Sequence, residues 1–341
     1  MIMADNDILS YERVSEDKNL DITLRPKKFC DFIGQELVKK NLHIYIEASK
    51  RRGDVLDHIL FSGPQGLGKT TLSQIIAHEI DVDIKATSGP VLAKPGDLAG
   101  ILTNLKQGDI LFIDEIHRLN TTIEEYLYSA MEDYSIDILI DQGPSARSVK
   151  INLPRFTLVG STTREGLLTP SFRARFGVLE KLDFYSWVEL QEIAMKSAKI
   201  LRIEIDERSA EMIAKSSRGT PRIVNRFVRR IRDVAQVKGY NKITEDIVEM
   251  GLEMLGVDKN GLGGMDRKIL QAIIKHGGGP VGLKTVAVSV SEQEDTIEEV
   301  YEPFLIQKGY LSKTPRGRIA TQLAHKYMDS DALMGKQSTL F

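Results

Sequence analysis

One glycine-rich segment constrains this chain more than any other part of its sequence. Residues 58–72, HILFSGPQGLGKTTL, have the pattern of a short apolar strand, a glycine loop (63–68) and a helix that opens at Lys69. The loop contains G-x-x-x-x-G-K-T, in which glycines permit positive φ angles, so successive backbone N–H groups can surround an anion. The following helix adds the positive end of its dipole. The segment therefore predicts a phosphate-binding loop rather than a purely structural glycine turn.

The residue types in this loop suit a triphosphate bound together with Mg²⁺. Gly66 and Gly68 allow the backbone to approach the phosphates closely. Lys69 can reach the β- and γ-phosphates as a point charge, and the hydroxyl of Thr70 can ligate Mg²⁺. Thr71 follows in the first helical turn, so we expect it near the phosphates too.

The bulk properties exclude several classes of protein. A chain of 341 residues is long enough for two or three domains with real cores. Its net charge of −2 gives no global basic field, so any nucleic-acid contact needs a local basic patch. The single cysteine, Cys30, excludes an internal disulfide framework. Neither a signal peptide nor a long apolar run is apparent, so we expect a cytoplasmic protein without a membrane segment.

Short apolar strands alternate with helical stretches after the loop. Strands are expected over residues 83–86, 109–113 and 156–160. This alternation predicts an α/β domain with a buried parallel sheet, whose carboxyl edge carries the polar groups. Asp114 and Glu115 follow one strand, and Thr163 follows another.

These polar residues complete a nucleotide-hydrolysing pattern. Asp114 would hold Mg²⁺, Glu115 would polarise an attacking water, and Thr163 would hydrogen-bond the γ-phosphate or that water. An acidic pair or a threonine at a strand end is often only a helix cap, so the interpretation depends on the loop. The sequence does not decide whether His117 is a switch or a structural histidine. Arg173 and Arg175 could supply a guanidinium from a neighbouring subunit, although such a motif by itself is usually a surface pair.

A predicted β-hairpin interrupts the alternation. Its strands, 136–141 and 149–153, enclose QGPSARS. An isolated hairpin is marginal in water, so its apolar face should lie either on its own domain or on a partner protein. The sequence favours neither.

The part of the chain from residue 185 onward has a different pattern. Residues 185–256 are helical, with a core stripe at Ile223, Phe227 and Ile231, and residues 261–264 have the composition of a linker. Three helical stretches then precede a strand–turn–strand over residues 310–321, which predicts a winged helix. The third of these helices is acidic, so phosphates would repel it, and the wing is the cationic alternative.

Eight motifs in order, GPQGLGKTT, DEIHRL, MEDYSIDILI, GSTTR, RARFG, RGTPRIVNRFVRR, MDRKIL and TPRGRIAT, resemble those of one family. This is the RuvB family of bacterial Holliday-junction branch-migration motors, which are AAA+ ATPases. The resemblance implies a large AAA+ P-loop domain (1–184), a small helical lid domain (185–255) and a winged-helix head domain (256–330). A disordered tail is expected over residues 331–341.

The resemblance also implies ATP as the nucleotide, with Mg²⁺, and an ATP site between subunits of a ring, typically a homo-hexamer. Thr163 matches sensor 1, Arg222 matches sensor 2, and Arg175 matches the arginine finger. Further nucleotide contacts are implied for six residues: Leu24, Arg25, Glu132, Asp133, Tyr134 and Tyr185.

The implied function is ATP-driven translocation of DNA that moves Holliday junctions in recombination and repair. Lys313, Arg316 and Arg318 of the wing match sequence-independent DNA contacts, and the hairpin 136–153 matches the element that docks on RuvA. RuvC would join the complex that resolves the junction. The last five residues, 337–341, resemble a sliding-clamp-binding peptide, although an inert tail is the better expectation.

Three other functions fit parts of this sequence. A DExH helicase fits DEIH but needs a second ATPase-sized domain, for which too few residues follow Tyr185. A non-catalytic nucleotide-switched DNA regulator would not need both Glu115 and Arg175. A clamp-loader-like AAA+ ATPase is the nearest alternative. Gln65, in place of proline, and Ser161, in place of alanine, are small departures that remove no catalytic group.

Overall fold

The computed structural model describes residues 23–139 and 148–337. They belong to two compact units, one spanning Arg25–Phe184 and the other comprising, of the described residues, 23–24 and 185–337. Within the described residues, the centre of the first unit is a five-stranded parallel sheet with the order β2-β3-β6-β1-β7. Its strands are β1 (Ile59–Ser62), β2 (Ile84–Ser88), β3 (Ile110–Asp114), β6 (Thr157–Thr162) and β7 (Val178–Lys181).

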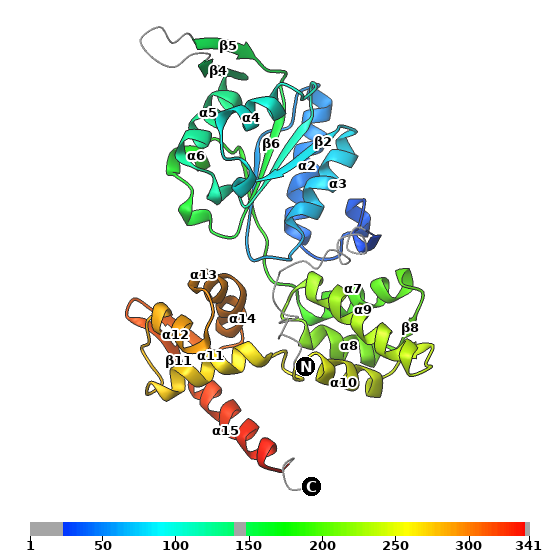
Figure 1. The fold of residues 1–341 in the computed structure, drawn as a ribbon. Coiled ribbons are helices and arrows are strands. Elements are labelled where there is room, and N and C mark those ends of the chain that lie inside the picture. Colours follow the sequence, from blue (N-terminus) through cyan, green and yellow to red (C-terminus); the bar gives the residue numbers. More distant parts are fainter. Residues whose placement is uncertain (1–22, 140–147, 338–341) are drawn as a thin grey trace. The chain divides into compact units, whose positions relative to one another are not determined.

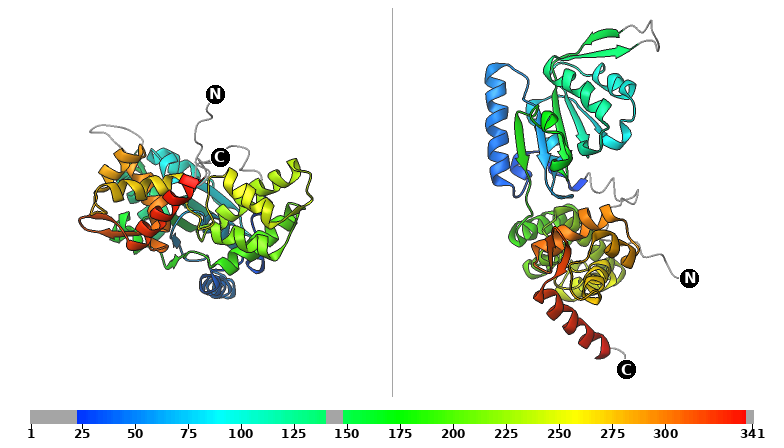
Figure 2. Two further views of the ribbon diagram at one scale, coloured as in Figure 1. Left: turned by 90° about the horizontal axis from the view of Figure 1, so that it is seen from below. Right: turned by 90° about the vertical axis from the view of Figure 1, so that its left-hand side faces the viewer.

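Helices cover both faces of this sheet, which explains why its central strands are almost continuously apolar. One face carries α2 (Glu36–Arg52) and α3 (Lys69–Ile80), and the other carries α4 (Pro95–Leu102), α5 (Thr121–Glu132) and α6 (Pro170–Arg173) (Figures 1 and 2). The predicted α/β domain is therefore confirmed. β7 was not predicted. It lies at an edge of the sheet, where buried and exposed residues alternate and no apolar run marks the strand.

The predicted hairpin consists of β4 (Ser135–Leu139) and β5 (Ser148–Asn152), which pair antiparallel. It projects from the edge of the sheet at which the parallel strands begin (Figure 1). Ile136 and Leu153 are buried in the core of the unit, so the base of the hairpin packs on its own domain. The connecting residues, 140–147, lie outside the described part of the chain.

The second unit begins with four helices, α7 (Trp187–Ile200), α8 (Glu207–Ser216), α9 (Pro221–Val237) and α10 (Glu245–Met254). Between them, β8 (Glu204–Ile205) and β9 (Lys242–Ile243) form a short parallel pair. On α9, Ile223, Phe227 and Ile231 are buried at every fourth position, as predicted.

A winged helix follows within the same unit. It contains α11 (Gly264–Lys275), α12 (Leu283–Val290), α13 (Glu294–Thr296) with a π-helical turn (Ile297–Tyr301) and α14 (Glu302–Gln307), and the wing strands β10 (Leu311–Thr314) and β11 (Gly317–Ala320). The predicted winged-helix domain is thus confirmed.

The C-terminal helix and the junction before the winged helix differ from expectation. Helix α15 (Gln322–Gln337) extends into the segment where we expected a disordered tail. Residues 338–341 of the clamp-like peptide lie outside the described residues. Gly261, Leu262 and Gly263 are buried, so the expected linker is a packed junction. Of the residues that the structure describes, none belongs to a helix with the length and apolar character needed to cross a bilayer.

Candidate active site

The glycine loop joins the carboxyl end of β1 to the start of α3. Gly63, Gly66 and Gly68 have φ angles of 130°, 77° and 106°, a region that favours glycine. A Cβ on Gly63 would lie 2.4 Å from the carbonyl oxygen of Leu182, so a side chain does not fit there. Because Gly68 caps α3 without a side chain, nothing at the cap residue competes with an anion for the first N–H groups of the helix.

Lys69 is held close to this loop. Its side chain is buried, and its Nζ donates to the carbonyl oxygens of Gly63 at 2.6 Å and Pro64 at 2.8 Å. Thr70 and Thr71 follow it in the first turn of α3. The loop, the lysine and the two hydroxyl residues therefore lie together at the carboxyl edge of the sheet, as predicted.

The acidic pair lies at the end of β3, at the same edge. Ser161 Oγ and the backbone N–H of Glu115 both donate to Asp114 Oδ1, the latter at 3.1 Å. These two donors fix the carboxylate of Asp114. Glu115 has a φ of 49°, and its Oε2 forms an ion pair with Arg118 Nη1 at 3.1 Å. Ser161, which sequence reasoning treated only as a departure from the family, thus orients the predicted metal ligand.

The end of β6 adds a hydroxyl group that is buried without a partner. Among the described residues, no group hydrogen-bonds to Thr163 Oγ1. A buried hydroxyl without a partner is costly, so it indicates a position where a ligand oxygen fits. The neighbouring Thr162 is satisfied, because its Oγ1 accepts from Arg164 N at 3.0 Å and lies 3.0 Å from His117 Nδ1.

His117 therefore bridges the turn after β3 and the end of β6. Thr162 Oγ1 and His117 Nδ1 share one hydrogen bond, in which either atom can be the donor according to the tautomer of the ring. Burial lowers the pKa of His117 from its ordinary value of 6.5, and the positive charges of Arg164, Arg118 and Lys69 lower it further against the opposing effect of Glu115. The ring is neutral at pH 7. Sequence reasoning did not find this contact, because it joins residues 45 positions apart.

Arg175 lies at the opposite edge of the sheet. Two residues after it comes Gly177, and then Val178 N donates to the carbonyl oxygen of His58 just before β1 begins. Lys69 follows the end of β1, so the length of a four-residue strand, roughly 13 Å, separates the two edges. Arg175 Nη1 pairs instead with Glu132 Oε2 at 2.8 Å. One chain does not bring Arg175 to its own loop.

Glu132, Asp133 and Tyr134 lie at this opposite edge too. The Tyr134 ring packs against Phe156, just before β6 begins, at 6.0 Å, and Arg155 lies over the same ring at 5.6 Å. Any contact between these three residues and a nucleotide at the loop would therefore involve a second copy of the chain.

The remaining predicted nucleotide contacts are divided between the units. Arg25 belongs to the first unit, whereas Leu24, Tyr185 and Arg222 belong to the second. Tyr185 is buried, and its N–H donates to the carbonyl oxygen of Gly219 at 3.0 Å. Arg222 lies in the first turn of α9. The roles of these residues at the nucleotide stay predictions.

The wing offers fewer free cations than its sequence suggested. Arg316 is exposed in the turn between β10 and β11. Lys313 is exposed, but its Nζ contacts Glu298 Oε1 at 2.6 Å. Arg318 is only 9% exposed and forms a bidentate ion pair with Glu302. Its Nε donates to Oε1 at 2.5 Å and its Nη2 donates to Oε2 at 3.1 Å. The expected DNA contact at Arg318 does not fit this burial, because the acidic helix neutralises its guanidinium.

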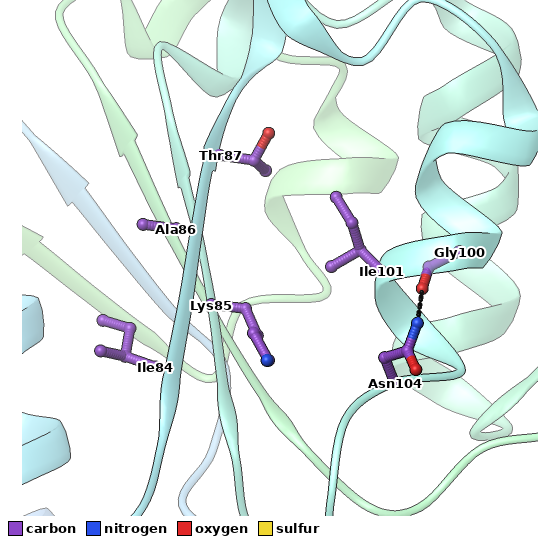
Figure 3. Close-up of a pocket in the computed structure, with 7 residues that line it drawn as sticks. All are labelled: Ile84, Lys85, Ala86, Thr87, Gly100, Ile101 and Asn104. Carbon is purple, nitrogen blue, oxygen red and sulfur yellow. Dashed lines mark hydrogen bonds between the residues drawn. The ribbon is translucent and has the colours of Figure 1, made fainter.

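A hollow of about 470 Å³ lies elsewhere on the first unit (Figure 3). It lies beside the edge strand β2 and helix α4, and is lined by Ile84, Lys85, Ala86, Thr87, Gly100, Ile101 and Asn104. Two strands, β3 and β6, separate β2 from β1, so this hollow is not part of the glycine-loop site.

Three family models match nearly the whole chain. They describe the P-loop domain of the Holliday junction DNA helicase RuvB (residues 24–182), the RuvB AAA lid domain (185–258) and the RuvB C-terminal winged helix domain (259–329). Two bacterial relatives carry the name Holliday junction branch migration complex subunit RuvB. The one from Myxococcus xanthus is 53% identical over 100% of both chains, and the one from Salinibacter ruber is 53% identical over 96% of both.

Solved structures give the same result. The RuvB Holliday junction branch migration motor of Thermotoga maritima is 52% identical and covers 90% of this chain and 98% of its own, with a TM-score of 0.83. A mutant of that protein is 53% identical and covers 89% of this chain and 98% of its own, with a TM-score of 0.84.

Proposed function

This chain belongs to the RuvB family, and from that premise we propose that it is an ATP-driven DNA translocase that moves Holliday junctions in recombination and repair. The observation that carries the proposal is the convergence of three features at one edge of the sheet. They are the glycine loop with Lys69, the acidic pair Asp114 and Glu115, and the buried hydroxyl of Thr163. A phosphate cradle, a metal-binding carboxylate, a base and a hydroxyl donor are the groups that phosphoryl transfer to water requires.

The donor set of this site fits ATP with Mg²⁺. Thr163 Oγ1 is a buried donor without a partner in the part of the chain that the structure describes, and Asp114 is a carboxylate already oriented by Ser161. Thr70 and Asp114 would hold Mg²⁺, which when bound neutralises charge on the β- and γ-phosphates. In hydrolysis, Lys69 binds the phosphate oxygens, Glu115 takes a proton from the attacking water, and Thr163 donates its hydrogen to hold the γ-phosphate or that water.

Arg175 would complete this site from a neighbouring subunit. Its position at the opposite edge of the sheet from Lys69 supports a role in trans, because a head-to-tail ring brings one subunit's Arg175 edge to the next subunit's loop edge. Glu132, Asp133 and Tyr134 lie at the same edge and would approach the neighbour's nucleotide with it. We expect the ring to be a homo-hexamer. Leu24, Arg25, Tyr185 and Arg222 would contact the nucleotide within the subunit that binds it.

The wing would bind DNA without sequence preference. Arg316 is the exposed cation at its tip, and Lys313 can exchange Glu298 for a phosphate. Arg318 is the poorer candidate for this role, because its guanidinium is buried against Glu302, where it supports the wing. A grip by few cations is weak and salt-sensitive, which suits a protein that must keep moving along DNA.

The projecting hairpin, residues 135–152, is proposed to dock on RuvA. Its base is anchored in the core while Val149 on β5 is 42% exposed, so an apolar side chain remains available to a partner. RuvC would act on the same junction. We expect this assembly in the cytoplasm, where the chromosome lies. A sliding-clamp contact by residues 337–341 is a weaker proposal.

Branch migration of a synthetic four-way junction tests this function. We expect movement that requires ATP and Mg²⁺ and that a RuvA preparation strongly enhances. Hydrolysis of ATP without junction movement, with RuvA present, would contradict the proposal and favour a clamp-loader-like ATPase.

A further inference from the structure

The junction between the helical lid and the winged helix is closely packed. Gly261, in the segment expected to be a linker, has a φ of 84°. A Cβ there would lie 2.8 Å from the carbonyl oxygen of Ser216 at the end of α8, and 3.4 Å from Phe304 Cζ on α14. Elements from both domains therefore close around the connecting backbone, leaving no space for a side chain.

Arg218 is the main contact across this junction. It precedes α9 by three residues and has a φ of 56°, an unusual conformation for an arginine. Its side chain is only 3% exposed, its Nε donates to the carbonyl oxygen of Gly261 at 2.9 Å, and its guanidinium lies over the Phe304 ring at 4.6 Å. A residue of the lid domain is thus buried among residues of the winged helix.

Asp266 is the acidic partner of Arg218. The Arg218 Nη2 donates to Asp266 Oδ2, and the carboxylate is completely buried. The same Oδ2 accepts from Gly263 N at 2.7 Å, so Asp266 also caps the start of α11. One carboxylate therefore joins the turn before α9 to the first turn of α11.

Further hydrogen bonds reinforce the connection. Arg267 donates to the carbonyl oxygens of Leu262 at 3.1 Å and Gly256 at 3.2 Å. Asp258 accepts from Leu262 N at 2.8 Å and from the hydroxyl of Tyr327 on α15 at 2.7 Å. Backbone before, within and after the junction is fixed in this way, so the two domains have little freedom to hinge there.

The same short turn carries the predicted sensor 2. Residues 218–222 read RGTPR, and Arg222 lies on the first turn of α9. Within the turn, Thr220 Oγ1 donates to the carbonyl oxygen of Arg218 at 3.2 Å. A shift of α9 at Arg222 would therefore be passed through this turn to Arg218 and to its contacts on α11 and Phe304.

We propose that Arg218 is the positioning residue through which movement of Arg222 with the nucleotide state reaches the winged helix, with the lid and the winged helix moving as one body. This inference rests on the proposed function, since it assumes that ATP hydrolysis drives DNA movement. Arg218 contributes no group to ATP hydrolysis itself. Its loss separates the two activities: ATP is still hydrolysed, but the hydrolysis no longer moves DNA.

Two variants weaken the junction in different ways. Arg218→Lys keeps a positive charge for Asp266 but loses the Nε bond to Gly261 and the planar contact with Phe304. Insertion of two glycines between Lys259 and Asn260, both exposed, leaves the Arg218 side chain unaltered but lengthens the connection that holds Gly261 and Asp266 against it. The matched control is Arg208→Lys, which alters an exposed ion pair with Glu245 within the lid itself.

Three quantities are measured for each folded variant on the complete ring with RuvA. They are the KM for ATP, the DNA-stimulated hydrolysis rate and the branch-migration rate. We expect hydrolysis and KM to stay within about twofold of wild type while branch migration falls at least roughly tenfold in both junction variants. The control should match the wild type. If Arg218→Lys does not fold, the insertion variant alone tests the inference.

Parallel loss of hydrolysis and migration, or migration unchanged in the insertion variant, would overturn the inference. Failure of the proposed function gives a different result, because the wild-type protein would then hydrolyse ATP without moving a junction.

Discussion

Arg175 and Lys69 lie at opposite edges of the same parallel sheet. Arg175 precedes β7 at the edge where the strands begin, and Lys69 follows β1 at the edge where they end. The length of β1, roughly 13 Å, lies between them, and helices cover both faces of the sheet (Figure 2). A site that uses both residues therefore needs two copies of the chain, so the proposed role of Arg175 predicts that hydrolysis depends on assembly of the ring.

Glu115→Gln should separate ATP binding from ATP turnover. The amide keeps the size of the side chain but cannot take a proton from water, so hydrolysis should fall at least roughly a hundredfold while ATP binding persists. Fluorescent-nucleotide binding and steady-state hydrolysis measure the two effects. Glu125→Gln, an exposed change on α5, is the control. A variant with near-normal hydrolysis would remove Glu115 from the mechanism.

Thr163→Val should slow hydrolysis without destabilising the protein. Because the structure gives Thr163 Oγ1 no partner among the described residues, losing this hydroxyl should leave the free energy of unfolding unchanged or raise it by about 1 kcal/mol. Thr162→Val is the contrasting variant, since its hydroxyl bonds Arg164 N and His117, and it should destabilise the protein by about 1–3 kcal/mol. Thermal unfolding and hydrolysis rates distinguish them. Equal destabilisation by both would be inconsistent with the structure.

Mild acid should destabilise the first unit through His58. Burial lowers the pKa of His58 from 6.5, against the raising effects of its Met131 contact and the Asp57 charge. His58 Nδ1 accepts from Leu158 N at 2.9 Å, so protonation there would place two hydrogens against each other. Since the unfolded chain binds the proton more readily, this stability is complete above pH 6.5 and is lost as the pH falls through the folded pKa.

The expected loss is up to about 1.4 kcal/mol per pH unit in that window. Denaturant unfolding at several pH values measures it. His58→Gln should be less stable at pH 7 but should show a shallower decline with acid. His43→Gln, at an exposed position on α2, should keep the wild-type pH dependence. An unchanged slope in His58→Gln would contradict this assignment.

Arg316 and Arg318 should behave differently on the wing. Arg316→Ala should weaken DNA binding, reduce the slope of log K against log salt by about one, and leave stability unchanged. Arg318→Ala leaves Glu302 buried without its main partner and should cost about 3–5 kcal/mol of stability. Salt-dependent DNA binding and thermal unfolding test both. Normal stability in Arg318→Ala would show that the ion pair is not structural.

Local sequence patterns predicted most of the fold. Short apolar runs located β1, β3 and β6 because those strands are buried on both faces, and the spacing of Ile223, Phe227 and Ile231 located the core face of α9. The edge strand β7 lacks an apolar run, because one of its faces is exposed, and it was missed.

The sequence alone could not predict which charged side chains pair with one another. Nothing local distinguishes buried Arg318 from exposed Arg316, because the acid that neutralises Arg318 lies 16 residues earlier on another element. Arg218 was missed for the same reason, since its partner Asp266 is 48 residues away. The loop and the acidic pair were predictable because strand ends at one sheet edge converge whatever the details of packing.

Mixing two inactive variants tests the central claim most directly. Lys69→Ala should not bind ATP productively, and Arg175→Ala should bind ATP but hydrolyse it poorly. In a randomly mixed ring, an Arg175→Ala site can receive the intact Arg175 of a Lys69→Ala neighbour. We predict recovery of about a quarter of the wild-type hydrolysis rate in an equal mixture. Rings shown by native mass spectrometry to be mixed, yet no more active than the two variants alone, would contradict an ATP site completed by the neighbouring subunit.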